Sequence, residues 1–341
     1  MPDNTPLYPL KFEPIYKEKV WGGRGLEKLG RKLPGSASTR IGESWEVADL
    51  GVSSPSGGGG SARSIVNNGQ FLGTSLHELI ARYGERLLGR LSPGVSGNFP
   101  YLFKYIDIRE NVSVQVHPTS AYVRSHPKAC VKHEAWYIVD AKPGAVVYKG
   151  IREGVTPRQL RGAIASGTVQ EVEATLIKVP AKRGDCHYLP SGTCHAAGAG
   201  VLLAEIQNAC DTTFRVYDWG RTDRELHIEQ AMQCIEFGPP DVSQYEKRVT
   251  RPSRIGDAAQ LLACEHFRIH KVHATRNAMR ELAFNQISVW MVLEGSGQID
   301  PNNGAAPVEF SRDETLFFPA SLLNVQISIF QDAVWLEITF P

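Results

Sequence analysis

Four residues between positions 115 and 195 have the types and spacing of a metal site. Gln115 and His117 are separated by one residue, so on a β-strand both side chains point to the same face. Glu134 and His195 lie further along the chain. Imidazole nitrogens with a carboxylate suit zinc or another divalent first-row metal. A mixed oxygen and nitrogen set with few charges leaves an open position for water or substrate, as catalytic zinc sites do.

A competing metal set would use Cys186-His187 and Cys194-His195. Neighbouring residues on a strand point to opposite faces, so each pair offers only one ligand inward. We therefore interpret Cys186 and Cys194 as core or wall residues. The six cysteines include no Cys-x-x-Cys pair and are no disulfide framework for 341 residues, so we expect most of them to be reduced and buried.

A second stretch rich in chemistry runs from Ala204 to Arg221. Glu205, Arg215, Asp218 and Arg221 all lie within it. Arginine is the preferred side chain for holding a phosphate or stabilising an enediolate oxygen. Surface salt bridges are the alternative interpretation, and such pairs contribute little to stability. The residues alone leave both interpretations open.

The elements that must position these residues are mostly short strands. Strands are expected at 113–116, 135–139, 145–148, 176–179 and 201–206. Only three helices are indicated: one opened by the capping box Ser75 to Glu78, one by Thr156-Pro157, and one by Thr222 to Glu225. The sequence therefore predicts a mainly β protein with a few short helices.

The two halves of the chain repeat one pattern. Glu134-Ala-Trp136, an acidic turn before Pro190, and Glu205 correspond to Ser288-Val-Trp290, an acidic turn before Pro319, and Glu337. This pattern is typical of cupin barrels, the double-stranded β-helix or jelly roll, and two copies imply duplication rather than chance similarity of strands.

The second copy has lost the ligand set. Ser288 stands where the first copy has Glu134, and Asn324 stands where it has His195. We therefore predict a metal-binding cupin domain with helical insertions over residues 1–240. A degenerate cupin-like β domain is predicted over residues 241–341, with the boundary in Phe237 to Asp241.

Composition excludes several classes of function. Lys and Arg number 37 and Asp and Glu number 36, so the formal net charge of +1 argues against a nucleic-acid partner. No apolar stretch is long enough to span a bilayer, and the N-terminus has no signal architecture. We expect a soluble cytoplasmic protein. The low-complexity stretch from Gly51 to Ser61 is expected to have no regular structure.

Several further motifs are spread along the chain. They are Val20-Trp-Gly-Gly23, Gly42-Glu-Ser-Trp-Glu46, Phe99 to Ile108, Ser113 to Pro118, Lys132 to Ile138, Gly184 to His195 and Glu205 to Arg221. Together these segments resemble one known family, the type I mannose-6-phosphate isomerases (phosphomannose isomerases) in their short bacterial form. The resemblance covers nearly the whole chain and is densest over residues 99–221. The chain departs from the family pattern in the length of the stretch from Gly51 to Ser61, and at Phe214, where tyrosine is usual.

The resemblance implies a function and a set of roles. The family is zinc-dependent and interconverts mannose 6-phosphate and fructose 6-phosphate through a cis-enediol. A proton then moves between C1 and C2, and a counter-charge stabilises the oxyanion. The expected cofactor is one zinc ion per chain and the expected partner is a small-molecule sugar phosphate, in a monomer or homodimer. By position, the implied residues are the ligands Gln115, His117, Glu134 and His195, the catalytic Arg215, Lys132 and Glu205, and the substrate-binding Ser113 and Arg221.

Two points stay open at this level. The general base is Glu205, Lys132, Asp218 or a zinc-bound hydroxide. The alternative functions are another metal-dependent sugar-phosphate isomerase and a cupin that binds sugar without turning it over.

Overall fold

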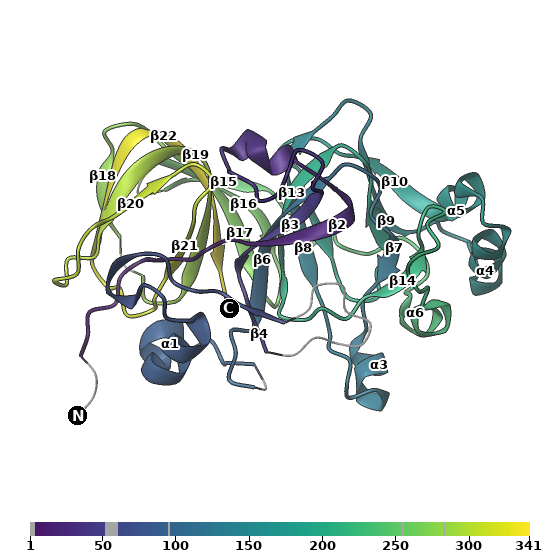
Figure 1. Ribbon diagram of the computed structural model, residues 1–341, viewed down its shortest axis with the longest axis horizontal. Coiled ribbons are helices and arrows are strands. Elements are labelled where there is room, and N and C mark those ends of the chain that lie inside the picture. Colours follow the sequence, from purple (N-terminus) through teal and green to yellow (C-terminus); the bar gives the residue numbers. More distant parts are fainter. Residues whose placement is uncertain (1–3, 52–60, 95, 254–255, 283) are drawn as a thin grey trace.

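Two β-barrels lie side by side in the computed structural model (Figure 1). Strands between residues 15 and 217 form the first barrel, and residues 10–11 with the strands from residue 249 onward form the second. The structure describes residues 4–51, 61–94, 96–253, 256–282 and 284–341. Most of the stretch from Gly51 to Ser61 lies outside the described residues. The mainly β character with few helices confirms the predicted fold class.

The first barrel consists of two antiparallel sheets. All five strands expected from the sequence occur here, within a few residues of their expected bounds. The six-stranded sheet has the order β11 (Cys186–Leu189), β8 (Glu134–Ala141), β13 (Val201–Asn208), β6 (Tyr101–Ile108), β3 (Ile41–Val47), β2 (Ile15–Gly23). The five-stranded sheet has the order β10 (Leu176–Pro180), β9 (Val146–Ile151), β12 (His195–Ala197), β7 (Val114–Val116), β14 (Phe214–Tyr217). A separate ribbon pairs β4 (Asp49–Leu50) with β5 (Ala62–Arg63).

The second barrel is a single nine-stranded sheet. Two long strands, β19 and β22, pair along most of their lengths, and register shifts after Val292 and Glu294 bend them so that the sheet curves round on itself. The strands are β1 (Leu10–Lys11), β15 (Val249–Ser253), β16 (Gly256–Ala263), β17 (Arg268–Ala274), β18 (Met279–Leu282), β19 (Ser288–Asp300), β20 (Val308–Ser311), β21 (Thr315–Phe318) and β22 (Val325–Thr339).

Strand β13 shows how the sequence divides the first barrel into an apolar end and a polar end. Its even-numbered residues Leu202 and Ile206 belong to the core that the six-stranded sheet shares with the second barrel. The alternate residues face the inside of the first barrel: Leu203 belongs to the apolar interior, whereas Glu205 follows two residues later. The strand therefore delivers polar side chains to one end of the barrel only.

Helices lie outside the barrels, and two of the three predicted ones are confirmed. Helix α1 (Leu76–Tyr83) begins at the Ser75–Glu78 capping box, and α4 (Pro157–Ser166) begins at Thr156, whose side chain accepts a hydrogen bond from the Gln159 backbone. The others are α2 (Glu85–Leu88), α3 (Ser120–Ser125), α5 (Val169–Thr175), α6 (Ile228–Cys234) and the 3-10 turns η1 (Gly25–Leu29) and η2 (Gly69–Phe71).

The predicted start of the third helix is wrong. Helix α6 begins at Ile228, and no side chain caps it, so Thr222 and Glu225 are not its capping box. The residues before it are held against β14 instead: the Arg215 guanidinium donates to the Glu225 carbonyl at 2.6 Å, and the His227 backbone donates to the Arg215 carbonyl at 2.7 Å. These tertiary contacts outweigh the local capping signal.

The N-terminal segment belongs to the second barrel as well as the first. Strand β1 pairs with β21, with Leu10 opposite Phe317, and the purple N-terminal trace in Figure 1 passes along the yellow-green barrel. One apolar core joins the six-stranded sheet, α1 and the second barrel, and includes Phe99, Phe103 and Phe340. The domain division near residue 240 stays a prediction.

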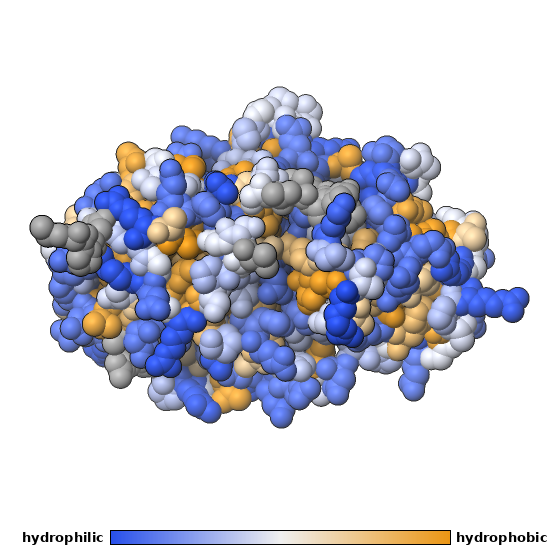
Figure 2. Space-filling view, turned by 90° about the horizontal axis from the view of Figure 1, so that it is seen from below, coloured by the Kyte–Doolittle hydropathy of each residue, from blue (hydrophilic) through white to orange (hydrophobic). Residues whose placement is uncertain are grey.

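On the face shown in Figure 2, hydrophobic residues form small groups among hydrophilic ones. No helix within the described ranges has both the length and the apolar character needed to cross a membrane.

Candidate metal centre and cavity

Three of the four predicted ligands converge at the polar end of the first barrel. His117 follows β7, Glu134 begins β8 and His195 begins β12, so three strands bring them together. His117 Nε2 lies 3.2 Å from Glu134 Oε2, and His195 Nε2 lies 3.0 Å from Glu134 Oε1. All three side chains are buried, with at most 1% exposed. Within the described ranges, this is the one cluster of at least three His, Cys, Asp or Glu residues that could hold a metal ion.

The two imidazoles are oriented by backbone carbonyls. His117 Nδ1 lies 3.1 Å from the Thr212 carbonyl, and His195 Nδ1 lies 2.8 Å from the Thr193 carbonyl. Each Nδ1 therefore carries the proton, which turns a lone pair on Nε2 toward the cluster. His117 Nε2 and both Glu134 carboxylate oxygens have no hydrogen-bond partner within the described part of the chain. Buried acceptor atoms left in this way fit a bound cation.

The protonation states also suit a metal. Burial lowers the pKa of His117 to about 3, and the Lys132 ammonium contributes, so the imidazole is neutral at physiological pH. Burial alone would raise the pKa of Glu134, but Lys132 and the two histidines outweigh it and hold that pKa well below its usual range. The cluster thus offers the neutral His117 imidazole and an ionised carboxylate, the forms that bind metals.

Gln115 and Lys132 connect this cluster to a cavity. Gln115 Nε2 lies 3.3 Å from His195 Nε2, and Lys132 Nζ lies 2.9 Å from Glu134 Oε2. Both residues line a cavity of about 280 Å³, whereas His117, Glu134 and His195 lie buried behind its wall. All four predicted ligands are therefore together, at the side of a cavity whose size is close to that of small-ligand sites.

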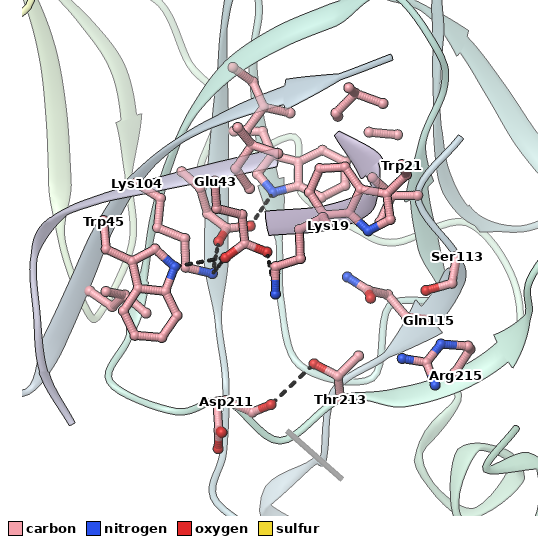
Figure 3. A pocket seen from close by; sticks show the side chains of 18 of the residues that line it. Lys19, Trp21, Glu43, Trp45, Lys104, Ser113, Gln115, Asp211, Thr213 and Arg215 are labelled. Atoms are coloured by element: carbon pink, nitrogen blue, oxygen red, sulfur yellow. Dashed lines mark hydrogen bonds and ion pairs between the residues drawn. The ribbon is translucent and has the colours of Figure 1, made fainter. Parts of the chain in front are cut away.

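Figure 3 shows how the cavity is lined. Ser113, Gln115 and Arg215 lie on one side, and Lys104, Glu43 and Trp45 lie on the other. The cavity also reaches Glu205 and Asp211. Of the nine predicted site residues, Ser113, Gln115, Lys132, Glu205 and Arg215 line the cavity directly.

A buried ion network faces the metal cluster across the cavity. Lys104 Nζ donates to Glu205 Oε2 at 2.7 Å, and the Trp136 indole donates to Glu205 Oε1 at 2.9 Å. Glu43 accepts from the Trp45 indole at 2.7 Å and lies 3.2 Å from Lys19 Nζ. Although burial would raise the pKa of Glu43, Lys19 and Lys104 bring it to about 2.

The sequence analysis did not single out the network residues outside Glu205. Lys104 is a lone cation inside the apolar segment Phe99 to Ile108, and Glu43 lies in Gly42 to Glu46, so both were quoted only as parts of motifs. A charged residue within a strand of otherwise apolar residues is the signal that could have found Lys104, because burial of a lone charge requires a partner.

Arg215 reaches the cavity from β14, next to β7 where it lies opposite Gln115. One guanidinium nitrogen donates to the Glu225 carbonyl, while Nε is buried with no hydrogen-bond partner in the described residues. Burial lowers the pKa of Arg215 from its ordinary value, and Arg224 and Arg221 contribute. The side chain remains cationic and keeps donors for a ligand.

Arg221 is not among the residues that line the cavity. Its guanidinium donates to Asp218 Oδ1 at 2.8 Å and to the Asn111 carbonyl at 2.7 Å. Arg224 shares the same Asp218 carboxylate, with Nε 2.8 Å from Oδ2, and does line the cavity. The structure therefore places Arg224, which the sequence analysis did not select, where Arg221 was expected.

One pair of cysteines is covalently joined. Cys130 and Cys210 form a disulfide next to the cavity, which the cysteine count did not predict. Cys186, Cys194, Cys234 and Cys264 are buried free thiols, as expected for most of the set. Cys186 and Cys194 lie in separate apolar cores and take no part in the metal cluster.

The fold and site together define a duplicated cupin with a metal-type cluster in its first barrel. The crystal structure of the mannose 6-phosphate isomerase from Bacillus subtilis has the same fold: its TM-score is 0.82 at 28% identity, covering 98% of this chain and 100% of that chain. A mannose 6-phosphate isomerase bound with zinc and yttrium shares the fold alone, with a TM-score of 0.71 at 15% identity over 98% of this chain and 100% of that chain.

Sequence comparison narrows the class further. Residues 9–143 match the family model of the phosphomannose isomerase type I catalytic domain. The mannose-6-phosphate isomerase ManA of Bacillus subtilis (strain 168) is 32% identical over 336 residues, which cover 96% of this chain and 98% of that protein. The chain belongs to the type I phosphomannose isomerases, and the family recognised from its motifs is confirmed.

Proposed function

We propose that this protein is a cytoplasmic, zinc-dependent isomerase that interconverts mannose 6-phosphate and fructose 6-phosphate through a cis-enediol, with one zinc ion per chain. The observation that carries the proposal is the buried cluster of His117, Glu134 and His195 beside a cavity lined by cations, in which His117 Nε2 and both Glu134 oxygens have no hydrogen-bond partner among the described residues. Membership of the family and the zinc-bound relative support it.

The ligand set fits zinc. His117, Glu134 and His195 would hold the ion, and the Gln115 carbonyl oxygen would complete the set, leaving a position for substrate. Zinc, when bound, supplies a Lewis acid that stabilises negative charge on the sugar oxygens. The carbonyls of Thr212 and Thr193 keep both imidazoles in the ligating tautomer.

The other side chains bind substrate and move the proton. Arg215 would stabilise the developing oxyanion from the wall it shares with Gln115, since its buried Nε has no hydrogen-bond partner among the described residues. Ser113, Lys132 and Arg224 would hold hydroxyls and the phosphate. Arg221 would act by positioning, because it holds the Asp218 carboxylate that also binds Arg224.

Among the candidate general bases, we favour Glu205. Its carboxylate lines the cavity and is held in place by Lys104 and Trp136, so it is presented in one orientation to a sugar carbon. Asp218 does not line the cavity and is occupied by two arginines. Lys132 is engaged by Glu134, which leaves it better placed to bind than to take a proton.

A coupled assay separates the candidate functions. The purified protein should convert fructose 6-phosphate to mannose 6-phosphate, lose that activity to a chelator and regain it with zinc. Reaction in D₂O should place deuterium on C2 of mannose 6-phosphate, as proton exchange through a cis-enediol requires. Faster turnover of another ketose phosphate would indicate a different sugar-phosphate isomerase, and binding without turnover would indicate a sugar-binding cupin. Chelator-resistant activity would contradict the zinc requirement.

A further inference from the structure

The disulfide between Cys130 and Cys210 joins two loops that both lead into the site. The residues are 80 positions apart, with their Cα atoms 6.0 Å apart. The first loop connects α3 to β8 and carries Lys132 two residues before Glu134. The second loop connects β13 to β14 and carries Asp211 before Arg215. One covalent bond therefore fixes the spacing of the two segments that deliver these side chains.

The surroundings of the disulfide connect it to the metal cluster. Thr212 lies two residues after Cys210, and its carbonyl orients His117, while its hydroxyl lies 3.7 Å from the Cys130 sulfur. Gln207 donates to the Cys210 carbonyl at 2.7 Å and accepts from Lys104 at 2.8 Å. A change in the position of Cys210 is thus transmitted to both the ligand His117 and the buried ion network.

This pair differs from every other cysteine of the chain. Cys210 lines the cavity and is 2% exposed, whereas Cys130 is partly exposed. The remaining cysteines are buried, and burial raises the pKa of Cys186 and Cys194 to about 12 and that of Cys234 to about 11. Such thiols are poor nucleophiles, so thiol chemistry is confined to the bonded pair.

We propose that Cys130 and Cys210 are a reversible redox modification site, at which a dithiol reductant releases the two loops and lowers isomerase turnover. The inference rests on the proposed function and deepens it by assigning a regulation to the same site. In cytoplasmic proteins a disulfide is usually transient and either catalytic or redox-sensing, and the position of this one matches a sensing role.

Reduction of the disulfide needs only the two cysteines and the dithiol reductant. A thiolate of the reductant attacks the Cys130 sulfur, the Cys130–Cys210 bond breaks, and Cys210 leaves as a thiolate that takes a proton. The second thiol of the reductant then attacks the mixed disulfide, Cys130 is released and takes a proton, and the reductant becomes a disulfide. Two electrons and two protons pass to the protein, and a low-molecular-weight disulfide reverses the exchange.

Reduction should loosen the loops without unfolding them. The His133 backbone still donates to the Asn208 side chain at 2.9 Å, and the Asn208 backbone donates to the His133 carbonyl at 3.2 Å. The expected losses are therefore moderate. Displaced partners of a metal ligand typically cost about 10-fold or more in metal affinity, and small misplacement of catalytic groups costs turnover in the same way.

The test compares the zinc-loaded protein before and after dithiothreitol. Under denaturing conditions the oxidised protein should show four reactive thiols and the reduced protein six. Reduction should lower kcat/KM for fructose 6-phosphate about 10-fold, speed zinc transfer to a colorimetric chelator about 10-fold, and increase proteolytic cleavage near residues 126–132. Treatment with oxidised glutathione should reverse all three changes.

Variants separate the disulfide from other effects of the reductant. Cys130→Ser should behave as the reduced protein in either condition, so any action of dithiothreitol on the metal itself would appear in this variant too. Cys264→Ser is the matched control, because that thiol is buried in the apolar core that the two barrels share and donates to the Phe267 carbonyl; it should respond as the unaltered chain does.

Several results would overturn the inference. They are six thiols after oxidation, equal kinetics and zinc release in the two states, or activity that rises on reduction. Absence of isomerase activity in both states would contradict the proposed function instead, and the thiol count, zinc release and proteolysis would still decide the redox inference.

Discussion

The two barrels have related residues at the same positions of their sheets, but these residues have different hydrogen-bond and charge partners. In the first, Glu205 on β13 lies opposite Trp136 on β8 and Lys104 on β6. In the second, Glu337 on β22 lies opposite Trp290 on β19 and His270 on β17. The register agrees position by position, which is strong support for duplication.

The glutamates Glu205 and Glu337 occupy corresponding positions, but their surroundings differ. Glu205 receives hydrogen bonds from Trp136 and Lys104, but burial raises the pKa of Glu337 to about 7, and the Trp290 indole is buried with no partner in the described part of the chain. Burial also lowers the pKa of His270, with Arg268 and Arg251 contributing. Ser288 replaces the central carboxylate of the metal cluster, and its hydroxyl donates to the Ile338 carbonyl.

The buried polar residues of the first barrel depend on one another. Each buried charge there is compensated by another, so loss of one member penalises the rest. In the second barrel, burial raises the pKa of the Glu337 carboxyl, so this group keeps its proton to a higher pH than an exposed glutamate does. The interior of that barrel is otherwise filled by aromatic packing, with Trp290 stacked 4.3 Å from Trp335.

The largest effect is expected from removing the second barrel altogether. A chain ended after Pro240 loses the cover over Tyr137, Leu202 and Ile206 on the outer face of the six-stranded sheet, and should be insoluble or molten. Near-UV circular dichroism and dye binding measure this. A soluble, zinc-loaded fragment with near-full isomerase activity would show that the barrels are independent.

Next in size are the ligand substitutions, which test whether only the first barrel holds metal. His117→Ala or Glu134→Ala should abolish stoichiometric zinc and lower activity about 10³-fold or more, since a Lewis acid worth several kcal/mol is lost. Ser288→Ala, at the corresponding position of the second barrel, should leave zinc content unchanged. Stoichiometric zinc in a folded His117→Ala, Glu134→Ala double variant, measured by mass spectrometry, would place the metal elsewhere.

Arg215→Ala should lower kcat roughly 10²-fold, as expected for loss of an oxyanion donor, with zinc content unchanged. Steady-state kinetics with a metal assay is the measurement. Arg221→Ala should cost less than about 10-fold, because that guanidinium is held by Asp218 and Asn111 away from the cavity wall. If Arg215→Ala raised only KM, Arg215 would bind substrate and transition state equally.

The smallest effect is on stability and concerns Glu337. Between about pH 4.5 and 7 the unfolded carboxyl is ionised while the folded one keeps its proton, so the free energy of unfolding falls as pH rises through this window. Glu337→Gln should therefore be more stable than the unaltered chain by on the order of 2 kcal/mol at pH 8, and similar to it near pH 4.

Denaturant unfolding at both pH values measures the difference. The corresponding change in the first barrel, Glu205→Gln, should have the opposite sign, because it leaves the buried Lys104 without its anionic partner. Equal responses of the two variants would mean that the two carboxyl positions are not distinguished by their partners.

The metal-ligand candidates could be predicted from the sequence because strand alternation and the internal repeat mark them. Gln115 and His117 are recognisable because strand alternation makes them share a face, and the repeated tryptophan and proline landmarks relate Glu134 and His195 to their missing counterparts. Lys104 and Glu205 are 101 residues apart, and only the register of β6 with β13 brings them together.

Residue spacing did not predict the features that depend on tertiary contacts. Nothing in the positions of Cys130 and Cys210, 80 residues apart, indicates a bond. Counting residues from the two prolines made Asn324 the counterpart of His195, but the two residues are not equivalent in the structure. Asn324 is exposed just before β22, whereas His195 is buried within the cluster. Local capping at Thr222 yielded to the bonds that Arg215 and Arg224 make with their neighbours.

Strand β1 also sets a limit on when this chain can finish folding during its own synthesis. Leu10 is made 307 residues before its partner Phe317. At translation rates of about 5–20 residues per second, Leu10 waits roughly 15–60 s for Phe317 to be added. During that time the segment around Leu10 can contact residues made soon after it, such as Asn67, whose backbone donates to the Lys11 carbonyl. The pairing of β1 with β21 must therefore form late in the synthesis of this chain.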